Sequence, residues 1–341
     1  MKNRIINLNI LLIILLWISP SNAIDKEALF NKQINHKARS SSTWSELTKK
    51  DLKDRILPAP DIIIDYLIND NLLQGYKKRP KMAVIDDTFF LDIVGAITEL
   101  PLPVRNHIHE HLAAVFLVEE LGGTGFCELL RDFDKNRLGF IVIDVGALSR
   151  KANEWASWKE NSPFAKKGIY TIEAEIERES NNIRKAAIQY ILLHEIGHLI
   201  GVAKEAHPHW IKGGDLRKWP FSNLSWISLE GGLKGKSRYD NAFTNRGYVR
   251  YYLFKEAPLA STEIDNTYVQ LLKTDFVSLY AATNTYDDFA ETYAMYVHVV
   301  LQNKPWKIRI IKEGKIVKEI TNPILDNRCA TKKRYMDMLF K

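Results

Sequence analysis

Hydrophobic and polar positions change their spacing several times along the chain, and each change predicts an element. The apolar runs at 114–118 and 138–145 are short and nearly continuous, as is typical of buried strands. Between 169 and 176 apolar and polar residues alternate, so this strand is expected to have one exposed face. Longer periodic segments predict helices at 104–112 and 287–301. A third predicted helix begins at Asn181 or Asn182, runs to about Leu199 and is ended by Gly201.

The first residues have the organisation of a secretory signal peptide. Lys2 and Arg4 precede an apolar run at 8–18, Pro20 ends this run, and small residues lead to Ala23. About a dozen apolar residues are few for a bilayer core of about 30 Å. We therefore expect cleavage after Ala23, which leaves residues 1–23 as the signal peptide. The mature chain is then expected to be exported, to a periplasm or out of the cell, without stable insertion into the membrane.

The remaining pattern divides the chain further. Residues 24–80 are polar and rich in lysine, and we expect an N-terminal extension there. Between 81 and 301, predicted strands are followed by separated helices, which indicates an α+β domain. Within this domain, residues 202–260 are rich in Trp, Tyr and Gly and are interpreted as an insertion. Residues 302–341 are expected to form a C-terminal tail.

Composition narrows the class of protein. The 341 residues include 48 Lys and Arg against 41 Asp and Glu, for a formal net charge of +7. No basic block is long enough to indicate a nucleic-acid groove, so nucleic acid is not expected as a partner. The two cysteines are Cys127 and Cys329. In an exported chain they are candidates for one long-range disulfide, and two separate thiols are the alternative.

The predicted helix that ends near Leu199 carries the sequence His194-Glu195-Ile196-Gly197-His198. A spacing of four places the two imidazoles on one helix face, one turn apart, where both can bind a single Zn²⁺. Glu195 then lies beside the metal, where its carboxylate can remove a proton from metal-bound water. Two His and a Glu in an otherwise apolar helix would be costly to bury without a partner. This segment therefore predicts a catalytic zinc site.

A catalytic zinc needs a third protein ligand. Glu291 in the last predicted helix is the preferred candidate, and His207 and His209 are the alternatives. Helical spacing places Asp287, Asp288 and Glu291 on one face. We expect Glu291 to bind the metal, while Asp288, or with less support Asp287, orients a metal-bound imidazole from behind.

These residues give the chain a resemblance to a known family. The sequence HEIGH on a helix, followed by a helix with Phe289-Ala290-Glu291, is similar to the zincin metallopeptidases that use Glu as third ligand. It most closely resembles the anthrax lethal factor and Pro-Pro endopeptidase group. The resemblance implies a zincin-like fold with a mixed sheet, an active-site helix and a cleft between two lobes. It also implies one Zn²⁺ per chain on His194, His198 and Glu291, with Glu195 as base, and an extended peptide paired with the strand at 169–176.

The chain departs from that group in two places. His198 and Glu291 are 93 residues apart (291 − 198), much farther than in the group, and the 202–260 insertion fills much of this interval. The Tyr that the group places seven residues before the ligand Glu is Asn284 here. Tyr280 and Tyr286 are the nearby candidates for stabilising an oxyanion, and packing is the alternative role for each.

Together these features predict an exported zinc metallopeptidase that hydrolyses peptide bonds in a peptide or protein substrate. Two alternatives remain open. One is a non-catalytic, zinc-stabilised interaction protein of the envelope, and the other is a zinc amidase that acts on a non-protein envelope substrate. Glu195 favours the enzymatic interpretations, because a purely structural zinc site gains nothing from a base beside an open coordination position.

Overall fold

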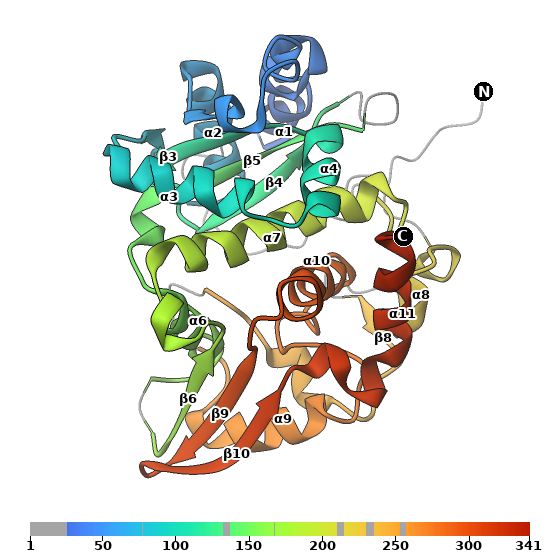
Figure 1. The fold of residues 1–341 in the computed structure, drawn as a ribbon. Coiled ribbons are helices and arrows are strands. Elements are labelled where there is room, and N and C mark those ends of the chain that lie inside the picture. The colour runs from blue at the N-terminus through green and yellow to red at the C-terminus, as the bar shows by residue number, and fades with distance from the viewer. Residues whose placement is uncertain are drawn as a thin grey trace, which may run out of the picture.

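A computed structural model describes residues 26–76, 78–131, 137–166, 168–209, 215–229, 235–252 and 257–341. The expected signal peptide, residues 1–23, lies outside the described residues. Helices and strands are both abundant, in agreement with the predicted α+β class. They are arranged as two sheets on either side of a long central helix, α7 (Arg184–Ala203) (Figure 1).

The larger sheet has five strands in the order β1-β3-β5-β4, with β2 paired to the end of β3. Their bounds are β1 (Ile56–Pro58), β2 (Lys81–Met82), β3 (Leu112–Glu119), β4 (Gly125–Leu129) and β5 (Gly139–Asp144). β1, β3 and β5 are parallel, whereas β4 is antiparallel to β5. β3 and β5 confirm the strands predicted at 114–118 and 138–145.

Alternation along these strands divides the core in two. Leu117, Ile141 and Ile143 face the main core, which contains the apolar residues of α7. Phe116 and Phe140 point to the opposite face. There they pack with residues of α2 (Asp61–Gln74) and of the segment before it, and α1 (Lys26–Ile34) packs on α2. Because both faces are covered, these strands are nearly continuous in apolar residues. α3 (Asp87–Thr98) and α4 (Leu102–His111) lie on the α7 side.

The second sheet contains β6 (Tyr170–Glu175), β9 (Lys307–Lys312) and β10 (Lys315–Thr321) in the antiparallel order β10-β9-β6. β6 matches the predicted half-exposed strand. Its outer edge, however, is covered by α6 (Ala152–Asn161). Asn161 both donates to and accepts from the Ile172 backbone at 2.7 and 3.0 Å, and the Ser157 hydroxyl does the same with Ala174 at 3.3 and 2.9 Å. The expectation that a peptide pairs with this strand is therefore wrong, since helix side chains occupy its edge.

α10 (Thr285–Met295) packs against α7 below the larger sheet and continues as a π-helix, Tyr296–Leu301 (Figure 1). Their contact is close at Gly197. A Cβ atom there would lie 2.8 Å from the Cα of Ala290, a distance that real Cβ atoms essentially never show. Glycine in the middle of the histidine motif thus lets the two helix backbones approach.

The ends of α7 differ from their prediction. The N-cap is Ile183, and the Asn182 side chain accepts a hydrogen bond from the Asn153 backbone instead. The helix also passes through Gly201 and ends at Ala203. Gly201 does not stop the helix; it leaves room for His207, whose Nε2 would lie 2.2 Å from a Cβ at 201. Among the described residues, α7 has the length and hydropathy of a membrane span, but it is the buried core helix here.

The flanking segments are built into these layers. The segment expected as an N-terminal extension supplies β1 of the larger sheet, and the segment expected as a tail supplies β9 and β10. The tail ends in α11 (Ala330–Leu339). The described parts of residues 202–260 contain α8 (Ser222–Ser225) and the hairpin β7 (Trp226–Ser228) and β8 (Lys236–Ser237). α9 (Ile264–Leu271) follows.

Short 3₁₀ turns complete the described elements. They are Lys37–Arg39, Ser41–Trp44, Leu52–Arg55, Val145–Leu148, Glu179–Asn181, Leu216–Lys218, Thr244–Tyr248, Ser261–Glu263, Pro323–Leu325 and Asn327–Cys329.

The close helix contact gives a prediction for Gly197→Ala. The added methyl group must push α10 away from α7, and overpacking of this kind costs about 1–3 kcal/mol. The better helix propensity of Ala offsets up to about 1 kcal/mol of this. We expect a net loss of about 1–2 kcal/mol in the free energy of unfolding, measured by urea denaturation. Gly247→Ala is the control, since a Cβ there meets no atom within 4 Å. Equal stability of the two variants would contradict the prediction.

Candidate metal centre

Three ligand atoms from α7 and α10 converge on one point. The Nε2 atoms of His194 and His198 are 3.1 Å apart, and Asp287 Oδ1 lies 3.7 Å from the first and 3.4 Å from the second. Among the described residues, His194, His198 and Asp287 are a group whose ligand atoms lie close enough together to hold one metal ion. A tetrahedral zinc with bonds of about 2.0–2.1 Å needs donor atoms about 3.3–3.4 Å apart. The observed spacing fits such an ion.

The local sequence explains how Asp287 reaches this point. Asn284 is the N-cap of α10, and its side-chain oxygen accepts from the backbone amides of Tyr286 and Asp287 at 2.9 Å each. The Asn284 amide group and the Thr283 hydroxyl both donate to Asp287 Oδ2 at 2.6 Å. One carboxylate oxygen is thus held in place, while the other points toward the histidines.

Glu291 does not join these three atoms. Its Oε1 contacts Nδ1 of His194 at 2.9 Å, on the opposite side of the ring from Nε2. Lys159 Nζ donates to the same oxygen at 2.9 Å, and the Ser278 hydroxyl donates to Oε2 at 2.7 Å. The carboxylate beside the two Nε2 atoms is therefore Asp287, and Glu291 lies where an orienting carboxylate was expected. Both carboxylates lie on the predicted face, but the close contact at Ala290 places Glu291 behind His194 and Asp287 in front of it.

Charge explains how these buried groups are kept ionised. Burial opposes ionisation of His194, but hydrogen bonds to Asp287 and Glu291 raise its pKa to about 10. Burial would raise the pKa of Glu291, yet the Lys159 ammonium and His194 lower it to about 2. The pKa of Asp287 is also far below its usual range, because the two histidines outweigh its desolvation. The two carboxylates therefore favour the cationic form of the His194 imidazole that lies between them.

Glu195 lies beside this cluster, as predicted. It is buried, and this burial raises the pKa of its carboxyl group. His194, His198 and a backbone hydrogen bond from Cys127 act in the opposite direction. Cys127 belongs to β4, the last strand of the larger sheet. The candidate base thus faces the edge of that sheet.

Asp288 does not support the metal site, contrary to the prediction. It is fully buried and accepts two hydrogen bonds from the equally buried Lys332 of α11, at 2.6 and 2.8 Å. The Trp226 indole donates to it at 2.9 Å, and Asp275 lies 3.2 Å from the same ammonium. Burial raises the pKa of Asp288 to about 6 in spite of Lys332. Asp288 therefore joins α10 to the C-terminal helix and to the 202–260 segment.

The two predicted tyrosines lie in different surroundings. The ring of Tyr280 stacks on His194 with centroids 5.2 Å apart, so it borders the site. Tyr286 packs edge-on against His207 at 5.1 Å, away from the three ligand atoms. Tyr252, which the sequence did not single out, contacts Tyr280 edge-on at 6.0 Å. Tyr280 therefore borders the candidate metal centre, and Tyr251 and Tyr252 pack against its ring, with centroids at 4.5 and 6.0 Å.

The remaining sequence candidates lie elsewhere. The Nδ1–H of buried His207 donates to the Pro208 carbonyl, and its ring packs on α10. Neither His207 nor His209 belongs to the group of converging ligand atoms found among the described residues. The candidate disulfide is not formed: both thiols are free. Cys127 lies on β4, whereas the Sγ of Cys329 donates to the Asp275 carbonyl below α11.

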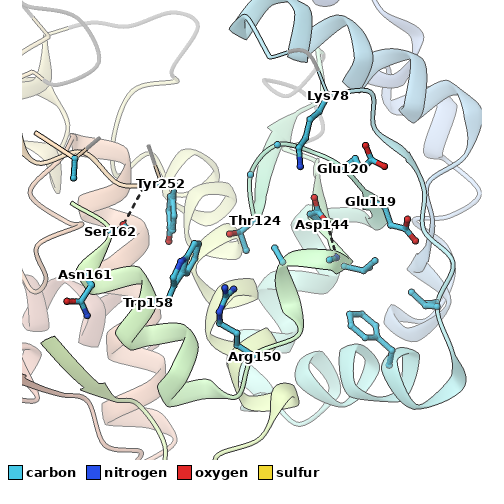
Figure 2. A pocket seen from close by; sticks show the side chains of 18 of the residues that line it. Lys78, Glu119, Glu120, Thr124, Asp144, Arg150, Trp158, Asn161, Ser162 and Tyr252 are labelled. Carbon is cyan, nitrogen blue, oxygen red and sulfur yellow. Dashed lines mark hydrogen bonds between the residues drawn. The ribbon is translucent and has the colours of Figure 1, made fainter. Parts of the chain in front are cut away.

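A cavity of about 1300 Å³ lies at the end of the larger sheet, separated from His194 by the rings of Tyr252 and Tyr280. Figure 2 shows Thr124 in its centre, Trp158 and Tyr252 on one side, and Asp144 and Glu119 on the other. Tyr252 lines both this cavity and the surroundings of the metal centre. The aromatic 202–260 segment therefore contributes part of a wall next to the site.

Two variants separate the roles of the carboxylates. Asp287→Ala removes a proposed ligand, so we expect it to lose bound zinc nearly completely. Glu291→Gln leaves the three ligand atoms and changes the group behind His194, so we expect a loss of about 10–100-fold in zinc affinity. Zinc per chain by elemental analysis and a competitive chelator titration measure these effects. Complete zinc loss in Glu291→Gln with full retention in Asp287→Ala would restore the original assignment.

The buried ion pair gives a prediction for stability. Lys332→Met leaves Asp288 buried without its cation, which typically costs about 3–5 kcal/mol. We expect this loss in urea unfolding monitored by tryptophan fluorescence. Lys333→Met is the control, because Lys333 lies next in the same helix and forms a half-exposed pair with Asp337. A similar small effect in both variants would argue against the role given to the pair.

Comparisons with known proteins add no family to this picture: no family model, no curated protein and no solved structure matches the chain.

Proposed function

We propose that this protein is a zinc-dependent metallopeptidase with a zincin-like fold. His194, His198 and Asp287 would hold the metal, and Glu195 would act as general base. The observation that carries the proposal is the meeting of three donor atoms, 3.1–3.7 Å apart, beside a buried glutamate. Two imidazoles and one carboxylate form a donor set suited to zinc and leave a fourth position for water or substrate.

The residues around the site support hydrolysis. Bound zinc would supply a water molecule of lowered pKa and a Lewis acid for the substrate carbonyl. The Glu195 carboxylate would accept the proton from that water and deliver it to the leaving amine. Burial raises the pKa of Glu195, which suits a group that must carry the proton between two steps. Asp287 and the pair of Glu291 with Lys159 would keep the histidines fixed in orientation.

The outer edge of β4, where the Cys127 amide is hydrogen-bonded to Glu195, supports an extended peptide as substrate. β4 is the last strand of its sheet, and its outer edge pairs with no strand in the described ranges. Cys127 in the middle of this strand contacts Glu195, so a peptide added along β4 would bring one of its carbonyls beside the base. An amidase for a small envelope compound would have no use for such an edge. The signal-like residues 1–23 support export, and we propose that the protein acts after export.

Glu195→Gln tests the proposed function. The substitution removes the base but none of the ligands, so we expect unchanged zinc content and a loss of cleavage by at least about 10²-fold. Mature protein and variant would be incubated with a diverse peptide library, and the products read by mass spectrometry. Glu205→Gln is the matched control, since Glu205 lies just beyond α7 and pairs with Arg137. If the wild type binds zinc and cleaves no peptide, the peptidase proposal fails and the non-catalytic zinc protein becomes the better hypothesis.

A further inference from the structure

The cavity beside the metal centre contains a guanidinium group with free hydrogen-bonding capacity. Arg150 stacks on the exposed Trp158, with its Cζ 4.7 Å from the ring centroid. Stacking uses the face of the guanidinium and leaves the N–H groups along its edge available. No hydrogen bond or ion pair joins Arg150 to the described part of the chain. An arginine held in this way is preorganised for a planar anion such as a carboxylate.

A second cation faces the same space. In Figure 2 the Lys78 ammonium and the Arg150 guanidinium point into the cavity from different walls, with Thr124 between them. Neither forms an ion pair with a described acidic residue. With Lys166, which also lines this space, the cavity wall offers three cations and a hydroxyl to a ligand that enters it.

The acidic residues of the wall are already engaged. Asp144 accepts from the backbone amides of Leu121 and Gly146 at 2.8 and 2.9 Å. Glu119 and Glu120 both pair with Lys81, at 3.3 and 3.1 Å. The remaining acid, Asp86, caps α3 by accepting from Phe89 N at 2.7 Å. Each of these carboxylates is held by a group other than the lining cations, so Arg150, Lys78 and Lys166 are not paired with them in the described residues.

A row of aromatic contacts joins this cavity to the metal centre. His194 stacks on Tyr280 at 5.2 Å, Tyr280 meets Tyr252 at 6.0 Å, and Tyr252 meets Trp158 at 5.4 Å between ring centroids. Thr124, which lines the cavity and directly precedes β4, is three residues from Cys127, which contacts the candidate general base Glu195. Three residues of extended strand span about 10 Å. A group in the cavity would therefore lie about three residues from the bond cleaved in a peptide paired with β4.

We propose that this cavity is a substrate subsite for a carboxylate group, bound by Arg150 with the support of Lys78. The inference rests on the proposed peptidase function and deepens it. The carboxylate is supplied by an Asp or Glu side chain about three residues from the cleaved bond, or by the C-terminus of a short peptide. Both sources offer the planar pair of oxygens that the guanidinium edge fits.

Cleavage rates test the preference for a carboxylate and show whether a side chain or the peptide C-terminus supplies it. The zinc-loaded mature protein is given peptide libraries with Glu or Gln at fixed positions, each with a free or amidated C-terminus. We expect about tenfold faster cleavage where a carboxylate is present, since hydrogen bonds to charged groups are worth about this much. Arg150→Gln should lose the preference, and Arg150→Lys should keep only part of it. Arg334→Gln, at an exposed arginine of α11, should behave like the wild type. Absence of any carboxylate preference in the wild type overturns the inference.

Binding without turnover separates this inference from the function on which it rests. Glu and Gln versions of one host peptide are titrated into the Glu195→Gln protein, with tryptophan fluorescence as readout. Tighter binding of the Glu version, lost when Arg150→Gln is added, supports the subsite even if the wild type cleaves nothing. That combination would reject the peptidase and keep the carboxylate site. Equal binding of the two peptides, or a preference that survives Arg150→Gln, overturns the inference.

Discussion

The close contact between α7 and α10 is the constraint on which the rest of the structure depends. At Gly197 and Ala290 the helices approach so closely that no side chain fits between them. Side chains one turn before this contact, and those directly after it, then meet across the interface. This is why the histidines of α7 face Asp287 and Glu291 of α10, and why one carboxylate lies in front of His194 and the other behind it. The arrangement of the candidate metal ligands is a consequence of how these helices pack.

Such packing buries two separate clusters of charges around α10. One contains His194, Glu291 and Lys159, so a cation that is not a metal ligand lies next to the metal centre. The other contains Asp288 with Lys332 and fixes the C-terminal helix to α10. Neighbouring acids of one sequence run, 287 and 288, thus point into different clusters. Ionised groups in an apolar interior need such partners, because an unpaired charge there costs several kcal/mol.

The sequence was sufficient for the parts of the fold that follow from local periodicity. β3, β5, β6 and the central helix lie where the apolar pattern indicates them, and the two histidines and Glu195 come together as the four-residue spacing requires. The choice between Asp287 and Glu291 could not be made from spacing, because both occupy one face and only the helix contact decides which is in front. Asn284 was an available signal: an N-cap three residues before Asp287 orients that carboxylate. Lys159 and Tyr252 carry no sequence signal, since distant segments bring them to the site.

The hydrogen bonds from α6 side chains to the β6 backbone depend on a near match between the rise of a helix turn and the rise of two strand residues. Four residues of helix advance about 6.0 Å and two residues of strand about 6.6 Å. Asn161, Ser157 and Asn153 can therefore reach Ile172, Ala174 and Ile176 in turn. The two repeats drift apart by about half an ångström at each step, so a fourth contact would be displaced by nearly 2 Å. The side chains of a helix can therefore hydrogen-bond to consecutive edge positions of a strand only over a short distance. This mismatch limits the length of strand edge that α6 can cover.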